Sequence, residues 1–187
     1  MSRAGLDVVG LFVDAGRRMY GEHVSQLEHA LQCAMHARRD RAADEIVLAA
    51  LLHDIGHLLE PTGDTPHHHH GIAAAQVLRA VAPSRVAWLV EHHVVAKRYL
   101  VTIDTRYREL LSPVSRTSLT LQGAELAVDE VAQLEAHAWF GDAVRLRRWD
   151  DDAKQPELVC EPLIAYRSLL ETCLGPQRWV EKTGIDR

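Results

Sequence analysis

The side chains of this sequence that could do chemistry are histidines and aspartates spread over most of its length. Four imidazoles and two carboxylates suffice for two adjacent metal ions that share one carboxylate, whereas a single ion would use only three or four of them. Because the set contains no cysteine, it suits iron, manganese or a similar metal better than a thiolate-preferring one. The candidate ligands are His29, His53, Asp54, His70, His93 and Asp150.

The pair His53 and Asp54 carries the strongest local signal, in the segment LAALLHDIGHLL. Neighbouring residues lie about 100° apart around a helix, so both side chains can face one bimetallic centre with the carboxylate bridging. The expected helix is apolar on every face except at His53, Asp54 and His57, which places it in the core. A lone His-Asp pair is more often solvated or capping. In a core helix, however, burying these polar side chains without partners would cost roughly 2–7 kcal/mol for each neutral group. The HDxxH motif therefore predicts a metal site.

The other candidate ligands have alternative interpretations. His29, in QLEHALQCA, is by itself more typical of a core or surface histidine. Its assignment as a metal ligand depends on its position about one helix before the HD pair. His70 is the last of four consecutive histidines; spacing does not fix which one binds metal, and we favour His70 because an apolar helix continues from it. An apolar helical stripe favours His93 over His92. Asp150 lies in RLRRWDDDAK, where its neighbours are expected at the surface.

Length, charge and cysteine content limit the class of protein. The 187 residues fit one domain, 1–187, and 21 Lys and Arg against 26 Asp and Glu give a formal net charge of −5. This charge provides no basic field for nucleic acid or an anionic membrane, and no segment approaches the length of a membrane span. Three cysteines without CxxC pairing predict reduced thiols in a cytoplasmic protein.

The periodicity and composition predict an all-α fold. Ala, Leu, Arg and Glu dominate, and aromatic residues make up 5% of the chain. Asp44 is the expected N-cap of the helix that carries the HD pair, and Pro61 is expected to close it. Helices are predicted at about 8–18, 24–39, 45–59, 70–81, 85–101, 113–119, 127–136, 139–148 and 162–174, with a loop at 61–69 and a C-terminal tail at 176–187.

Several segments occur in an order that resembles a known family. QLEHALQCA, AALLHDIGH, the helix from His70, EHHVVAKRYLV, LSPVSRTSLTLQG and LRRWD resemble the HD-domain mixed-valent diiron oxygenases, in particular the branch that cleaves organophosphonates. The similarity covers roughly residues 20–155. HDxxH alone is shared with the large HD phosphohydrolase superfamily, whereas EHHVVAKRYLV and the 115–122 segment are far more specific.

The resemblance implies a helical HD bundle and a resting Fe(II)/Fe(III) pair. Its core ligands would be His29, His53, Asp54 and Asp150, with Asp54 bridging and with His70 and His93 completing the second iron. Tyr20 and Glu22 resemble a mobile pair that exchanges places when substrate arrives, the tyrosine covering the substrate-binding iron at rest and the carboxylate contacting a substrate amine. One residue separates them here and two in the family pattern, so Glu22 matches better than Tyr20. The alternative is that Tyr20 packs in the core and Glu22 caps a helix.

The resemblance also implies a set of residues that hold a phosphonate, which needs donors and positive charge at close range. Taken singly, Lys97 and Arg147 would be solvated cations. Lys97, however, lies four residues after His93 on the same helix face, and Arg147 lies three residues before Asp150. The implied substrate-binding positions are His57, Lys97, Ser115, Gln122 and Arg147, with Ser118 as a further candidate.

The function that the resemblance implies is that of a dioxygenase, which uses two irons and O2 to cleave the carbon–phosphorus bond of a small α-hydroxyphosphonate, giving a carboxylate and phosphate. The substrate would be 2-amino-1-hydroxyethylphosphonate or an N-methylated or related analogue, with Glu22 favouring a cationic substituent, and a hydroxylase is expected to supply it. The alternative is a metal-dependent HD phosphohydrolase acting on a phosphate ester or nucleotide. A non-enzymatic HD module, which would normally have lost ligands, is a third hypothesis.

Overall fold

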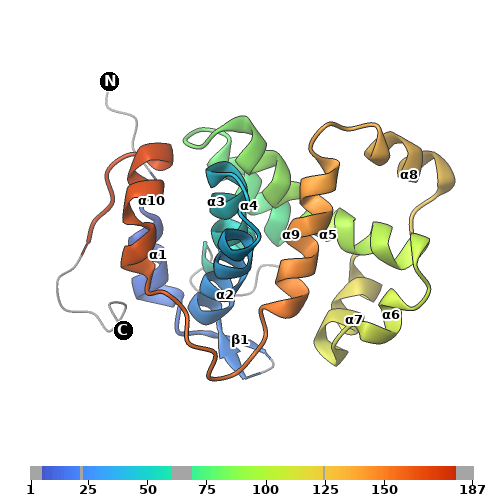
Figure 1. Cartoon of the computed structure of the whole chain (residues 1–187), viewed down its shortest axis with the longest axis horizontal. Helices are drawn as coiled ribbons and strands as arrows, with labels where there is room; N and C mark the ends of the chain where they lie inside the picture. Colours follow the sequence, from blue (N-terminus) through green and yellow to red (C-terminus); the bar gives the residue numbers. More distant parts are fainter. Residues whose placement is uncertain (1–5, 22, 60–68, 124, 180–187) are drawn as a thin grey trace.

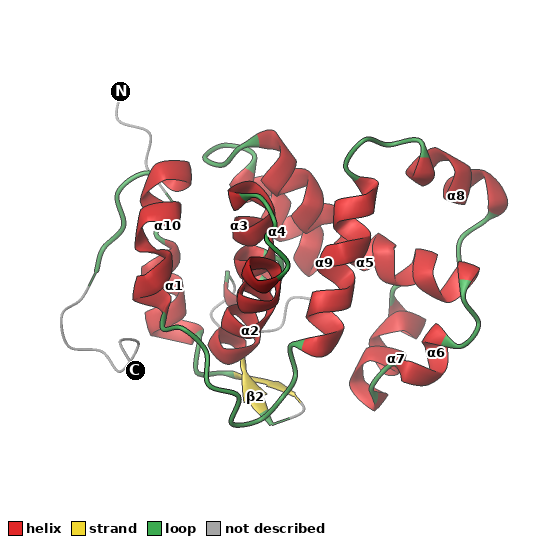
Figure 2. Cartoon of the chain, viewed as in Figure 1, coloured by secondary structure: helices red, strands yellow, loops and turns green. Residues whose placement is uncertain are grey.

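Five helices at the centre of the molecule carry most of its core (Figure 1). The computed structural model describes residues 6–21, 23–59, 69–123 and 125–179. In these ranges the regular secondary structure is helical apart from one short hairpin, which confirms the predicted all-α class (Figure 2). The central helices are α2 (Gln26–Arg39), α3 (Asp44–Leu52), α4 (His70–Leu78), α5 (Ser84–Ile103) and α9 (Phe140–Asp152).

Shorter elements flank this centre on two sides (Figure 1). α1 (Val8–Ala15) and α10 (Arg167–Leu174) lie together on one side, where the 3-10 turn η2 (Leu163–Tyr166) leads into α10. On the other side lie α6 (Tyr107–Leu110), α7 (Pro113–Leu121) and α8 (Val128–Glu135). A small second cluster around Leu100 and Leu119 packs this side, apart from the main core. Within the described ranges, none of these helices has the length and apolar character needed to cross a lipid bilayer.

The hairpin before α2 was not predicted. β1 (Met19–Gly21) pairs antiparallel with β2 (Val24–Ser25), so the expected first helix ends at Ala15 instead of residue 18. Ser25 then caps α2: its hydroxyl accepts from the backbone N–H of Glu28, whose side chain accepts from the N–H of Ser25. The expected start at residue 24 was therefore two residues early, and β1 instead brings Tyr20 beside α2.

The helix predicted over 45–59 is interrupted at the HD pair. α3 ends at Leu52, and the chain continues through Asp54 into the 3-10 turn η1 (Ile55–Leu58). α3 itself is buried from Ile46 to Leu52, as its apolar character on every face predicted. Asp44 is the first helical residue and Ala43 occupies the cap, so its predicted capping role is wrong by one position.

Several other boundaries differ from the predictions. α9 continues to Asp152, beyond the expected end at residue 148, which places Asp150 within its last turn. α6 is a four-residue helix that had no periodic signal. The predicted tail contains a packed residue near its start: Gln177 is buried, and its side-chain oxygen accepts a 2.8 Å hydrogen bond from the Val8 N–H at the start of α1.

Candidate metal centre and adjoining cavity

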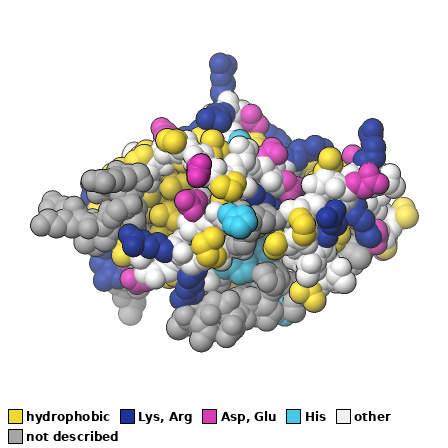
Figure 3. All heavy atoms as spheres, turned by 90° about the horizontal axis from the view of Figure 1, so that it is seen from below, with side chains coloured by type: hydrophobic (Ala, Val, Ile, Leu, Met, Phe, Trp, Pro, Cys, Tyr) yellow, Lys and Arg dark blue, Asp and Glu magenta, His cyan; other side chains and the backbone are white. Residues whose placement is uncertain are grey.

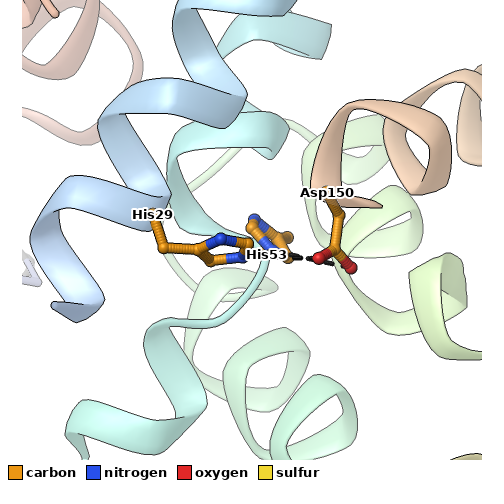
Figure 4. Close-up of side chains that lie close together, drawn as sticks. All are labelled: His29, His53 and Asp150. Atoms are coloured by element: carbon orange, nitrogen blue, oxygen red, sulfur yellow. Dashed lines mark hydrogen bonds and ion pairs between the residues drawn. The ribbon is translucent and has the colours of Figure 1, made fainter. Parts of the chain in front are cut away.

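The first group of possible ligands consists of His29, His53 and Asp150, all of them buried (Figure 4). They come from α2, from the end of α3 and from α9. The Nε2 atoms of the two imidazoles are 3.0 Å apart. Oδ1 of Asp150 lies 3.4 Å from Nε2 of His29, and its Oδ2 lies 3.9 Å from Nε2 of His53. The three side chains thus turn their donor atoms toward one point.

The second group consists of Asp54, His70 and His93, also buried. Nε2 of His70 and Nε2 of His93 are 2.9 Å apart. Oδ1 of Asp54 lies 3.1 Å from the first of these nitrogens and 3.4 Å from the second. His70 is the first residue of α4, and His93 lies in the middle of α5.

Asp54 faces both groups, one with each oxygen. Its Oδ2 lies 3.5 Å from Nε2 of His29 and 3.4 Å from Nε2 of His53, while Oδ1 faces the second group. The interruption after α3 places this carboxylate between the two pairs of imidazoles. The arrangement fits a carboxylate that bridges two ions.

Backbone carbonyls fix the orientation of three of the imidazoles. Nδ1 of His29 contacts the carbonyl of Ala153 at 2.6 Å, Nδ1 of His53 that of Ala50 at 2.9 Å, and Nδ1 of His93 that of Val90 at 2.6 Å. A carbonyl can only accept, so each Nδ1 carries a proton, and in its neutral form each ring presents a lone pair at Nε2. Three rings are therefore held in the tautomer that ligates metal through Nε2.

The donor atoms need cations between them. Two Nε2 lone pairs about 3 Å apart repel unless a proton or a metal ion lies between them. Oδ1 of Asp150 is buried and has no hydrogen bond within the described residues. Nitrogen and oxygen donors in two groups of three, with a shared carboxylate, fit two ions of the iron or manganese type.

The charges of the centre stabilise one another. Burial acts to raise the pKa of Asp54, but the imidazoles of His53 and His70 beside it hold that pKa well below its usual range. Burial acts to lower the pKa of His29, but the adjacent carboxylates of Asp150 and Asp54 raise it to about 9. For His93 burial prevails and lowers the pKa to about 4. At neutral pH the carboxylates are therefore ionised and His93 is neutral, whereas His29 is protonated in the metal-free protein, so a metal ion bound there would displace a proton.

A cavity of about 300 Å³ opens beside the second group. Figure 3 shows the molecule from below relative to Figure 1, and histidine side chains gather near the middle of the face seen there. All of the predicted substrate-contacting residues in the described ranges line the cavity; Glu22 lies outside those ranges. The lining includes the metal candidates Asp54, His70, His93 and Asp150, and the predicted Tyr20, His57, Lys97, Ser115, Ser118, Gln122 and Arg147.

The cavity wall also contains residues that the sequence analysis missed. Arg18, Met19 and Gln26 come from the hairpin and from the first position of α2. No motif identified them, because Arg18 and Gln26 were predicted to lie in helices and the two strands that direct this segment to the cavity have only five residues in all. Their closeness in sequence to Tyr20 was the one available signal.

Two lysines reach serines on the inner face of α7. Nζ of Lys97 donates to Oγ of Ser118 at 2.8 Å, and Nζ of Lys154 donates to Oγ of Ser115 at 2.9 Å. Burial and the nearby charge of Arg147 lower the pKa of Lys97 to about 7. The cationic form of Lys97 is thus poorly stabilised in the free protein, and an anion entering the cavity would favour it.

Arg147 is paired with carboxylates of its own helix. Its side chain is buried, Nη1 lies 2.5 Å from Oδ2 of Asp150, and Nε and Nη2 donate to Asp151. Burial acts to lower the pKa of Arg147, but these two carboxylates raise it well above the ordinary value. Arg147 is therefore not a solvated cation: it lines the cavity and also orients Asp150.

Aromatic rings stack on the candidate ligands. The ring of Tyr20 lies 3.9 Å from the imidazole of His29 at an interplanar angle of 16°, and the imidazole of His57 lies 4.3 Å from that of His70 at 21°. His92, the alternative to His93, stacks instead on Trp88, away from both groups. His67 and His68 lie outside the described residues.

η1 and α4 approach each other closely at Gly56. A Cβ atom added to this residue would lie 2.1 Å from the backbone carbonyl oxygen of His70. Only glycine permits this approach, which holds the first turn of α4 against the HD turn. The glycine of HDIGH, Gly56, therefore helps to position His70.

Comparison with known proteins identifies the family. The HD domain family matches residues 24–122. Over 170 residues the chain is 40% identical to hydroxymethylphosphonate dioxygenase of Gimesia maris, covering 88% of this chain and 85% of that protein. Over 155 residues it is 37% identical to [1-hydroxy-2-(trimethylamino)ethyl]phosphonate dioxygenase (glycine-betaine-forming) of Leisingera caerulea, covering 80% and 79% of the two chains. The resemblance inferred from the motifs is thus confirmed, and the chain belongs to the HD-domain family as a metal-dependent member.

Proposed function

We propose that this protein is a diiron dioxygenase that uses O2 to cleave the carbon–phosphorus bond of a small α-hydroxyphosphonate, releasing phosphate and a carboxylate. The observation that carries the proposal is a cavity that borders the second group of metal ligands and is lined by buried Lys97 and Arg147. Two similar proteins are named for dioxygenase activity on hydroxyphosphonates, which supports the same class of substrate.

The proposed cofactor is an Fe(II)/Fe(III) pair with O2 as co-substrate. His29, His53 and Asp150 would hold one ion, His70 and His93 the other, and Asp54 would bridge them. The ions would supply the oxidative chemistry with O2, which no amino-acid side chain can provide. The protein would contribute substrate orientation, charge neutralisation and a site shielded from water.

The phosphonate would lie against the wall formed by α5, α7 and α9. Its charge would be met by Lys97 and Arg147, and its oxygens by donors on Ser115, Gln122 and His57, while Ser118 would contribute to the same site by holding Lys97. Lys97 is suited to this role because its ammonium is poorly stabilised without an anion. We assign Tyr20 and Glu22 to the opposite end, where Glu22 would pair with a cationic substituent and Tyr20, stacked on His29, would shield the metals until substrate arrives.

The substrate requires an α-hydroxyl group next to phosphorus, so a hydroxylase is the expected partner enzyme. The three described cysteines are unpaired thiols, consistent with a reducing cytoplasm. The amino, trimethylammonio and unsubstituted hydroxymethyl compounds all belong to the proposed class, and the two named relatives act on different members of it.

The proposal is tested by anaerobic iron loading, followed by exposure to O2 with a panel of α-hydroxyphosphonates. Phosphorus NMR should show release of phosphate, and the partly oxidised protein should bind close to two irons with the electron paramagnetic resonance of a coupled Fe(II)/Fe(III) pair. The matched control is the same panel without O2. A protein that holds a single zinc after iron loading, and hydrolyses phosphate esters without O2, would instead be an HD phosphohydrolase.

A further inference from the structure

We propose that Lys154 is a positioning residue of the phosphonate site, which acts through the hydroxyl group of Ser115. This inference rests on the proposed function. Lys154 lies two residues beyond the end of α9, and only 9% of its side chain is exposed. Its Nζ donates to Oγ of Ser115 at 2.9 Å and lies 3.8 Å from Oδ1 of Asp150 and from Oδ1 of Asp151.

The bond from Lys154 determines how the Ser115 hydroxyl can be used. A serine hydroxyl has one proton to donate and two lone pairs that accept. Since the ammonium of Lys154 can only donate, it occupies a lone pair and leaves the proton of Ser115 to be donated. Ser115 is buried and lines the cavity, so that proton is available to an oxygen of a bound phosphonate. A bond accepted from a cation also polarises the hydroxyl and makes it a better donor.

Ser118 has a different arrangement, one turn further along α7. Its Oγ accepts from Lys97 at 2.8 Å and donates to the backbone carbonyl of Ser115 at 3.1 Å. Its proton is therefore committed within the helix. The two serines line the same cavity, but the geometry points to Ser115 as the hydroxyl donor and to Ser118 as the acceptor that holds Lys97.

Lys154 would act on the phosphonate indirectly, because it contacts Ser115 in the cavity lining without lining the cavity itself. Within the described part of the chain, the cavity lining includes Ser115 and Asp150 but not Lys154. The ammonium bridges the end of α9 to the first turn of α7, two elements whose contacting residues are far apart in sequence. Loss of the charge would leave Asp150 at least as good an acceptor for a cation, so metal binding should persist.

The test is a double-mutant cycle on binding, measured by anaerobic calorimetry with hydroxymethylphosphonate and the iron-loaded protein. Lys154→Met and Ser115→Ala should each raise Kd roughly fivefold to tenfold, in the range expected for the loss of one hydrogen bond. The double variant should bind no more weakly than Ser115→Ala alone. Iron content should remain at the wild-type value in all of them. The control is Arg148→Met, which removes a charge of the same sign from an exposed position of α9 and should leave Kd within about twofold of wild type.

Lys154→Arg is the second variant, in case Lys154→Met folds poorly. It keeps the charge and the donors and should bind within about threefold of wild type. The inference is overturned if Lys154→Met binds like wild type, if the effects of Lys154→Met and Ser115→Ala multiply in the double variant, or if Lys154→Arg is as weak as Lys154→Met. A wild-type protein that binds the phosphonate but releases no phosphate with O2 overturns the proposed function alone.

Discussion

Gly56→Ala should remove the metal of the second group while leaving the first intact. The added Cβ would lie 2.1 Å from the carbonyl oxygen of His70, and real Cβ atoms essentially never come closer than 3.0 Å, so the two must separate by about 0.9 Å. The neighbour is backbone, which cannot rotate away. Metal–ligand distances tolerate only about 0.2 Å, so His70 would leave the position from which it can bind.

The expected cost of this overpacking is about 1–3 kcal/mol of unfolding free energy, which a protein of this size tolerates. The bound iron measured after iron loading should fall from near two ions to near one, with the first group of ligands unaffected because its members come from α2, the end of α3 and α9 and not from α4. Gly141→Ala is the matched control, because a Cβ there meets nothing within 4 Å. Two bound irons and a wild-type melting temperature in Gly56→Ala would refute the reasoning.

Further substitutions test the separate parts of the centre. Asp54→Ala should lose both metals and His93→Ala mainly one, because the carboxylate faces both groups; equal partial loss on metal analysis would mean that Asp54 does not bridge. Lys97→Ala should keep the fold and two irons but raise KM for the phosphonate by removing a contact worth about 1.5–3 kcal/mol, and wild-type steady-state kinetics would contradict this. Arg147→Ala should lower the unfolding free energy by about 3–5 kcal/mol, since Asp150 and Asp151 lose their nearest cation; a loss under about 1 kcal/mol in denaturant titration would contradict this. Glu22→Gln should lower the ratio of kcat/KM for 2-amino-1-hydroxyethylphosphonate over hydroxymethylphosphonate roughly tenfold, and an unchanged ratio would show that Glu22 does not recognise the amine.

The helices could be predicted where burial dictates periodicity. The continuous burial of α3 and the inward stripe of α5 with His93 and Lys97 follow directly from the apolar residues around them. The interruption after Leu52 could not be predicted, because helix propensity favours continuation through HDIGH. Tertiary contacts override helix propensity there, because Gly56 packs on the carbonyl of His70 and Asp54 lies between the two histidine pairs.

The candidate ligands of the site were easier to predict than the charged contacts around them. Spacing and motif similarity brought the candidate ligands into one hypothesis because each sits on a strongly patterned segment. The roles of Lys154 and Asp151 were invisible, since a charged stretch at the end of a helix is usually solvated. Only the fold brings Lys154 against Ser115, and only the fold encloses Arg147 between two carboxylates.

The two groups of ligands come from α2, the HD turn, α4, α5 and α9, so bound ions would act as crosslinks between distant parts of the chain. An unfolded chain has no such preformed site, and ions that bind only the folded form stabilise it by about 2.7 kcal/mol at a concentration one hundred times Kd. That is a substantial fraction of the stability of a small domain. Iron supply would then control how long the protein survives proteolysis in the cell, so that scarcity of the metal would reduce its abundance as well as its activity.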